Sequence, residues 1–377
     1  MAKLTLPERE LVEPGHLACQ GCGAALAMRL FLKGTGPDTA LVIPACCWAV
    51  IAGPMPTTCL KVPTAFSAFE ATASVASGIK AGLRRTGRGE TLVAGFAGDG
   101  GTADIGIQAL SGAAERNEDM IYVCYDNEAY MNTGIQRSGS TLPGTWTTTT
   151  PAGVGKTTPK KDMPAIMAAH AIPYVATLNP SFPEDFVAKV KKAASMHGLR
   201  YLHVLADCPT GWKHDPSLMV KVGRLATTSH LWPLYEVVEG AYRVTWEPSN
   251  PTPLEEYLKL QGRFAGMSPA EVASLKKMVE ERWKALKART TTGTLATGSS
   301  PPSSATVAPV PSSPSPRAPA PASTSKMGPP AISATSRAEA AELPLCYKTA
   351  KRCDGSCGML QPGGLCWELF ALGPRHF

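Results

Sequence analysis

Short apolar runs rich in β-forming residues alternate with segments of helical character along most of this chain. The apolar runs predict buried strands at residues 40–44, 91–96, 120–125, 174–177 and 200–206. The segments between them predict helices at residues 24–32, 63–83, 105–113, 163–170 and 181–197. Strands that alternate with helices in this way form parallel sheets. The pattern therefore predicts an α/β fold, in which a mostly parallel sheet carries helices on both faces.

Two capping boxes predict helix starts more sharply than periodicity does. Ser181 and Glu184 predict the start of the helix that runs to about residue 197, and Ser268 and Glu271 predict the start of a C-terminal helix. The C-terminal helix has one apolar face, made by residues 272, 275, 279, 283 and 286. Residues 217–246 carry scattered aromatic side chains and are predicted as loose surface segments.

The stretch 92–134 reads as strand, glycine turn, helix, strand and polar loop. A strand–helix–strand unit of this length is a parallel pair joined by a right-handed crossover. Asp99 follows the first strand and Asn127 follows the second, 28 positions later. We therefore expect both side chains at the carboxyl edge of the sheet, where open α/β sheets bind ligands.

The residue types at this edge suit a metal-bound diphosphate. A carboxylate and an amide oxygen are ligands for Mg²⁺, which takes its other oxygens from phosphates and water. The glycines of Gly98-Asp99-Gly100-Gly101 allow backbone N–H groups to approach a diphosphate, and the next helix offers its N-terminus to the anion. The alternative for a Gly-Asp-Gly sequence alone is a tight turn after a strand.

Eleven cysteines are many for a chain without a secretory signal, and four of them fall at predicted element ends. Cys19 and Cys22 form a C-x-x-C pair before a helix, one of Cys46 and Cys47 follows a strand, and Cys208 follows another. Four thiolates can hold a [4Fe–4S] cluster or a zinc ion, and sequence does not distinguish the two. The alternative is four unrelated buried cysteines.

Composition and charge limit the kinds of partner that the chain is expected to bind. The net charge is +7, but the basic residues are dispersed, so we expect neither nucleic-acid nor membrane-surface binding. Residues 39–60 are uncharged, yet the prolines within them favour a strand and a loop over a membrane span. The charged N-terminus is not a secretory signal, and we expect a cytoplasmic location.

Beyond residue 290 the composition changes to Ser, Thr, Pro and Ala, which predicts a disordered C-terminal extension. We divide the chain into a cofactor-binding domain at 1–245, a C-terminal helical segment at 246–290, a linker at 291–343 and a cysteine-containing tail at 344–377. The spacing of the cysteines in the tail matches no metal-binding pattern, so its role is left open.

Four motifs together identify a family resemblance over residues 10–288: GHLACQGCG, GDGGTADIG, YDNEAYMNTGIQRSG and CPTGW. They resemble the β subunits of 2-oxoacid:ferredoxin oxidoreductases, most specifically that of pyruvate:ferredoxin oxidoreductase. The resemblance implies a thiamine diphosphate-binding fold. It implies that Gly98, Gly100 and Gly101 line the diphosphate, and that Asp99, Asn127 and the carbonyl of Ala129 hold Mg²⁺.

The resemblance also implies that Asn132 faces the substrate and that a [4Fe–4S] cluster is bound by Cys19, Cys22, Cys47 and Cys208. Cys46 is then a bystander, because the family carries a small residue at its position. Cys59 and Cys124 match no ligand position, and Cys124 is expected in the core.

The implied activity is the coenzyme A-dependent oxidative decarboxylation of pyruvate to acetyl-CoA and CO₂, with electrons passing to ferredoxin. The implied partners are an α-type subunit that supplies the glutamate activating thiamine, and γ/δ-type subunits or a ferredoxin-like domain that carry further clusters. Alternatives within the class are branched-chain 2-oxoacids or oxalate as substrate. An alternative outside it is a non-redox thiamine diphosphate decarboxylase or synthase with structural zinc.

Overall fold

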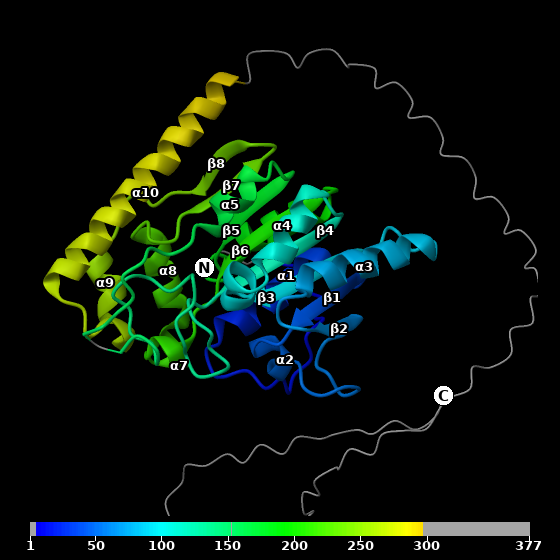
Figure 1. Cartoon of the computed structure of the whole chain (residues 1–377), viewed down its shortest axis with the longest axis horizontal. Helices are drawn as coiled ribbons and strands as arrows, with labels where there is room; N and C mark the ends of the chain where they lie inside the picture. Colours follow the sequence, from blue (N-terminus) through cyan, green and yellow to red (C-terminus); the bar gives the residue numbers. More distant parts are fainter. Residues whose placement is uncertain (1–4, 152, 297–377) are drawn as a thin grey trace, which may run out of the picture. The chain divides into compact units, whose positions relative to one another are not determined.

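One eight-stranded sheet organises the part of the chain described by the computed structural model, residues 5–151 and 153–296, with side chains described up to residue 290. The strand order is β2-β1-β3-β4-β6-β5-β7-β8 (Figure 1). The strands are β1 Thr39–Pro44, β2 Thr64–Ser67, β3 Leu92–Gly98, β4 Met120–Asp126, β5 Tyr174–Leu178, β6 Leu199–Leu205, β7 Leu234–Val238 and β8 Ala241–Trp246. Strands β1 to β6 pair in parallel, whereas β7 and β8 join antiparallel at one edge.

Helices cover both faces of this sheet, as predicted. They are α1 Gly23–Thr35, α2 Cys47–Ile51, α3 Thr72–Arg85, α4 Ile107–Glu115, α5 Met163–Ala169, α6 Pro183–Ala194, α7 Pro209–Trp212, α8 Met219–Thr228, α9 Leu254–Lys259 and α10 Pro269–Ala296. One core cluster joins α1 and α6 to one face, and a second joins α3, α4 and α5 to the other. Strands β1, β4 and β6 are buried along their whole length because both of their faces are covered. The predicted α/β class is confirmed.

A third core cluster lies beneath α8, α9 and α10 and includes Trp212 and Tyr257. Figure 1 shows α10, in yellow, along the outer edge of the sheet, where it contacts β8. Leu275, Val279 and Leu286 on its predicted apolar face are buried. No helix in the described ranges is long and apolar enough to cross a membrane.

Residues 63–83 are not one helix, and this prediction was wrong in its first part. Strand β2 occupies Thr64–Ser67 and pairs in parallel with β1, so that Leu41 lies opposite Thr64. Helix α3 begins only at Thr72. The free edge of β1 offers backbone partners that sequence periodicity does not reveal, and pairing there overrides the small-residue helical pattern.

Residues 217–246 are also more regular than predicted. They form a 3₁₀ turn at Pro216–Leu218, helix α8 and the strands β7 and β8. The aromatic residues in this stretch belong to the sheet rather than to a loose surface, since Tyr235 of β7 is buried and stacks on Tyr242 of β8. Cross-strand aromatic pairs of this kind stabilise an antiparallel edge.

One capping box is confirmed and the other is wrong. The Ser268 N–H donates to Glu271 Oε2 at 2.7 Å, and the Glu271 N–H donates back to Ser268 Oγ at 3.3 Å. By contrast, α6 begins at Pro183, after a Phe182 cap that makes no side-chain hydrogen bond, and ends at Ala194. The Ser181 N–H instead donates to Asn179 Oδ1 at 2.9 Å, which places Ser181 in a turn before the helix.

Helix α10 continues to Ala296, past residue 291, where the predicted linker begins. The remainder of that linker and the cysteine-containing tail at 344–377 lie outside the described residues.

Candidate functional site

The carboxyl ends of β3 and β4 bring Asp99 and Asn127 together. The two strands are direct neighbours in the sheet, with Gly98 opposite Tyr125. Asp99 follows β3, Asn127 follows β4, and the Asn127 backbone N–H donates to Asp99 Oδ1 at 3.3 Å. Both residues are buried, and Asp99 is inaccessible to solvent. The parallel crossover inferred from the sequence accounts for this meeting.

Three groups predicted to hold a metal ion converge at this point. One terminal atom of the Asn127 amide lies 2.9 Å from the Ala129 carbonyl oxygen and 2.9 Å from Asp99 Oδ1. With the amide nitrogen there, it donates to both oxygens; with the amide oxygen there, three oxygens face one another. Neighbouring oxygens around an octahedral Mg²⁺ lie about 2.9 Å apart, since each Mg–O bond is about 2.0–2.1 Å. The donor set and its spacing therefore fit Mg²⁺.

The surroundings of Asp99 leave its carboxylate in need of a cation. Ser138 Oγ donates to Asp99 Oδ2 at 2.5 Å. Burial raises the pKa of Asp99 well above its usual range, and the nearby carboxylate of Asp126 raises it further. A buried carboxylate of this kind is costly to ionise unless a positive charge compensates it. A bound metal ion would supply that charge.

The glycine-rich turn after β3 forms a π-helical segment, Gly100–Asp104, that leads into α4. A Cβ atom at Gly100 would lie 2.5 Å from the ring of Tyr130, so this position requires glycine. A Cβ atom at Gly101 would lie 3.0 Å from the Phe69 ring. The end of β3 and the π-helical segment that follows it are thus packed so closely against their neighbours that backbone atoms form the wall of the site.

One pocket, open to solvent, collects the predicted cofactor-binding residues. Its lining includes Gly98, Gly100, Gly101, Asn127, Ala129, Asn132 and Cys47. Asn132 is exposed at the open side of the pocket. Tyr125 also lines this pocket, and its buried hydroxyl lies against the Cys46 thiol.

The predicted cluster ligands lie in loops that meet beside this pocket. Cys22 caps α1, Cys47 begins α2, and Cys208 caps α7, where its Sγ accepts a hydrogen bond from the Gly211 N–H at 3.4 Å. The loop with Cys19 and Cys22 is joined to the loop with Cys208, because the Gly23 N–H donates to the carbonyl oxygen of Asp207 at 2.9 Å.

The thiols of these loops influence one another. Burial raises the pKa of Cys47, and the thiols of Cys46, Cys208 and Cys22 raise it further. Burial likewise raises the pKa of Cys208 to about 12. Among the described residues, no three His, Cys, Asp or Glu side chains stand close enough together to hold a metal ion. The four thiols therefore lie near one another without surrounding a common centre. Cysteine thiols are ligands of iron–sulfur clusters and of zinc.

The other cysteines of the described ranges lie in the core. Cys46, Cys59 and Cys124 are buried, and Cys124 sits within β4 as expected.

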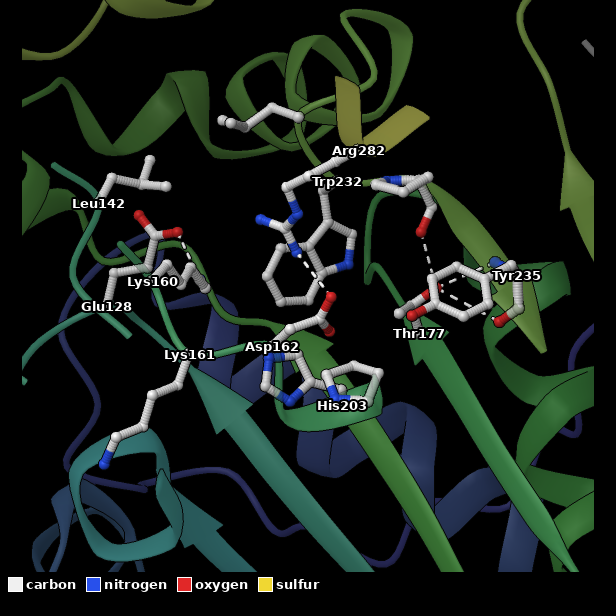
Figure 2. Close-up of a pocket in the computed structure, with 13 residues that line it drawn as sticks. Glu128, Leu142, Lys160, Lys161, Asp162, Thr177, His203, Trp232, Tyr235 and Arg282 are labelled. Carbon is white, nitrogen blue, oxygen red and sulfur yellow. Dashed lines mark hydrogen bonds and ion pairs between the residues drawn. The ribbon is translucent and has the colours of Figure 1, made fainter. Parts of the chain in front are cut away.

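A network of buried charges beside Asn127 could not be seen in the sequence alone. Asp126 and Glu128, on either side of Asn127, both pair with Lys160 Nζ at 2.7 Å. His203 Nε2 lies 2.9 Å from Asp126 Oδ2, so His203 is packed within this network. Figure 2 shows Lys160 directed at Glu128 from the wall of a second pocket that His203 also lines. The acidic residues on both sides of Asn127 in the motif are the feature of the sequence that could have indicated this network.

Comparison with known proteins shows which chains this one is similar to. Residues 46–204 match the family model of the thiamine pyrophosphate enzyme C-terminal TPP-binding domain. Pyruvate synthase subunit PorB of Methanothermobacter marburgensis is 51% identical over 280 residues, which cover 74% of this chain and 97% of that subunit. Ketoisovalerate oxidoreductase subunit VorB of Pyrococcus horikoshii is 48% identical over 295 residues, which cover 76% and 95%. The solved 2-oxoglutarate:ferredoxin oxidoreductase of Magnetococcus marinus is 19% identical, with a TM-score of 0.46 over 73% of this chain and 96% of that one.

Proposed function

This chain belongs to the family of 2-oxoacid:ferredoxin oxidoreductase β subunits, and from that premise we propose that it binds thiamine diphosphate–Mg²⁺ and a [4Fe–4S] cluster. The observation that carries the first part is the convergence of the Asp99 carboxylate, the Asn127 amide and the Ala129 carbonyl beside a glycine-lined pocket. The second part is supported by the position of Cys47, which lines the same pocket.

The roles of the chain's own residues follow from their positions. Asp99, Asn127 and the Ala129 carbonyl hold the metal ion, and Gly98, Gly100 and Gly101 let the diphosphate approach the backbone. Asn132 lies at the pocket mouth, where it orients the 2-oxoacid by hydrogen bonding. Bound thiamine diphosphate supplies the carbanion and the electron sink for decarboxylation. Cys19, Cys22, Cys47 and Cys208 hold the cluster that accepts electrons singly.

We propose pyruvate as the substrate and coenzyme A as the acyl acceptor, with ferredoxin as the electron acceptor. The relatives named pyruvate synthase subunits support pyruvate. The similar identity to ketoisovalerate oxidoreductase subunits favours branched-chain 2-oxoacids as the second candidate. Rates of low-potential dye reduction by the native complex with pyruvate, 2-oxoisovalerate and oxalate decide between them, and a rate with pyruvate below the others would overturn the first choice.

Partner subunits complete the enzyme in this proposal. No residue of the chain matches the motif of the glutamate that activates thiamine, so an α-type subunit supplies it, and γ/δ-type subunits or a ferredoxin-like domain carry electrons onward. The purified chain alone is then inactive. Acetyl-CoA formation from pyruvate and coenzyme A by the isolated chain would contradict this.

A non-redox thiamine enzyme with structural zinc is the rival from another class. Anaerobic analysis of iron, acid-labile sulfide and zinc in the isolated full-length chain separates the two. About four irons with matching sulfide support the proposed function. Zinc without sulfide would refute it.

A further inference from the structure

The backbone between the two proposed metal-ligand positions adopts a conformation that L residues rarely take. Glu128, between Asn127 and Ala129, has φ of +65°. A non-glycine residue in this left-handed region costs about 1 kcal/mol or more, and it persists where its surroundings hold it. The turn that presents the Asn127 amide and the Ala129 carbonyl to the same point therefore needs an anchor.

The Glu128 side chain provides that anchor through two cations from distant parts of the chain. Lys160 Nζ lies 2.7 Å from Glu128 Oε1, and an Arg263 guanidinium nitrogen lies 2.7 Å from Oε2. The side chains of Glu128 and Arg263 are each 2% exposed. The Glu128 backbone is also fixed, since its carbonyl oxygen accepts from Thr141 Oγ1 at 2.6 Å.

Arg263 belongs to the C-terminal segment that sequence analysis separates from the cofactor-binding domain. It lies in the 3₁₀ turn Gly262–Phe264 after α9. Gln261 Oε1 and the Tyr257 hydroxyl accept hydrogen bonds from it at 2.9 and 3.0 Å. Its guanidinium lies 3.8 Å from the ring centre of Trp212. The planar group is thus fixed in orientation before it meets Glu128.

A buried ion pair of this kind contributes little net free energy to the stability of the folded chain. Taking these charges out of water costs several kcal/mol per ion, and apolar residues of the same volume often serve as well. The pair does, however, fix the position of Glu128 in two directions, and so fixes the peptide groups on either side of it. Pre-organisation of ligands by surrounding groups is a common determinant of metal affinity.

We propose that Arg263 and Glu128 are positioning residues for the metal–diphosphate turn, so that cofactor binding by the domain at 1–245 depends on the C-terminal segment. This inference rests on the proposed function, because it assumes that the turn at Asn127–Ala129 holds Mg²⁺.

The test compares Arg263→Met with a matched control, Arg200→Met, in the full-length chain within its native complex. Arg200 is also a buried arginine paired with an aspartate, Asp119, but it lies at the opposite end of the sheet, near the start of β6. Binding of thiamine diphosphate is titrated with Mg²⁺ after removal of cofactor, and the thermal midpoint of each variant is recorded. Arg263→Lys serves as the conservative variant.

We expect Arg263→Met to raise the Mg²⁺ concentration for half-maximal thiamine diphosphate binding by about tenfold or more. Arg200→Met should lower the thermal midpoint while leaving this concentration within about twofold of wild type, because its ion pair lies far from the turn. Arg263→Lys should recover part of the affinity, since an ammonium can pair with Glu128 but lacks the planar fork. If Arg263→Met does not fold, the lysine variants are compared instead. Arg263→Lys should then lose more affinity for the cofactor than Arg200→Lys.

The outcomes separate this inference from the proposed function. Unchanged Mg²⁺ dependence in Arg263→Met, or equal losses in both methionine variants, would overturn the positioning role and leave the proposed function intact. Failure of the wild-type complex to bind thiamine diphosphate with Mg²⁺ would overturn both.

Discussion

The indole N–H of Trp212 donates a hydrogen bond to the backbone carbonyl oxygen of Asn127, with 2.8 Å between nitrogen and oxygen. Trp212 closes the short helix α7, which Cys208 caps, whereas Asn127 carries the amide of the proposed metal site. One buried hydrogen bond therefore joins the loop of a proposed cluster ligand to the proposed metal turn. The CPTGW motif has a structural reason for its tryptophan as well as for its cysteine.

We expect Trp212→Phe to lower both stability and cofactor affinity. The substitution leaves the Asn127 carbonyl without its donor, and an unsatisfied buried acceptor costs about 1–3 kcal/mol of unfolding free energy. Affinity for thiamine diphosphate–Mg²⁺ should fall about tenfold, because the turn loses one of its supports. Denaturant unfolding and cofactor titration measure the two effects.

Trp232→Phe is the matched control. The Trp232 indole N–H also donates to a buried carbonyl, that of Leu178, at 3.0 Å. Its loss should cost similar stability and leave cofactor affinity unchanged. Equal loss of affinity in both variants would contradict a specific role for Trp212.

Asp99→Asn should stabilise the chain when no cofactor is bound and abolish metal-dependent cofactor binding. The raised pKa of Asp99, caused first by burial and then by Asp126, means that the folded chain pays to keep this carboxylate ionised. The stability that protonated Asp99 gives at low pH is thus lost as the pH rises above about 4 towards the pKa of Asp99 in the folded chain. Asparagine does not ionise, so the variant avoids this loss at pH 7. We expect a gain of about 1–3 kcal/mol in unfolding free energy for the cofactor-free chain.

Asp104→Asn gives the contrasting result. The pKa of Asp104 is lowered, because its hydrogen bond with Lys161, together with other donors, outweighs the effect of burial. Its carboxylate also accepts from the Tyr130 hydroxyl at 2.9 Å. We expect this variant to lose stability with or without cofactor. A cofactor-free Asp99→Asn chain that is less stable than wild type would show that Asp99 is a structural residue.

The meeting of Asp99 and Asn127 could be predicted from sequence because it depends on local rules. A parallel crossover places successive strand ends on one edge, and the glycines mark the close approach between them. The cysteine loops could be assigned to strand and helix ends for the same reason. Their mutual placement could not be derived from spacing alone, since it depends on how α2 and α7 turn beyond the sheet.

The ion pairs of Glu128 could not be predicted from the sequence, because its partners are distant in sequence and belong to no recognisable pattern. Lys160 lies in a loop without periodicity, and Arg263 lies in a segment whose only visible signals were helical. A charge pair between such segments is set by tertiary packing. The antiparallel edge was missed for a related reason, since β7 and β8 are short and are defined by the pairing of β7 with β5 and of β8 with β7.

Acid should destabilise the chain through Asp119 at the end of the sheet remote from the site. Burial alone would raise the pKa of Asp119, but the Arg200 guanidinium and Lys80 outweigh it and lower this pKa to about 2. A carboxyl with a lowered folded pKa contributes stability above its unfolded pKa of about 4 and loses it as pH falls towards 2. Wild type should therefore lose on the order of 1–2 kcal/mol more than Asp119→Asn between pH 5 and pH 2. Parallel pH-dependent unfolding curves for the two proteins would contradict this.

The final prediction concerns which cysteines hold the cluster, and the neighbours Cys46 and Cys47 decide it. The pKa of Cys47 is raised by burial and then by the thiols of Cys46, Cys208 and Cys22, so Cys47 lies near two other proposed ligands. The pKa of Cys46 is raised by burial, and its further contacts are with Tyr125 and with backbone groups of α2 and of Gly98. Cys47 is therefore placed to join a four-thiolate site, whereas Cys46 packs against the strand ends.

We expect Cys47→Ala to lose iron and acid-labile sulfide after anaerobic reconstitution of the isolated full-length chain, as should Cys19→Ala, Cys22→Ala and Cys208→Ala. Cys46→Ala and Cys124→Ala should retain about four irons per chain, because Cys46 packs against Tyr125 and backbone groups and Cys124 is buried within β4. Thermal midpoints confirm that each variant is folded. Retained iron in Cys47→Ala together with its loss in Cys46→Ala would shift the ligand by one residue. That result would mean that α2 turns differently at its first residue when the cluster is bound.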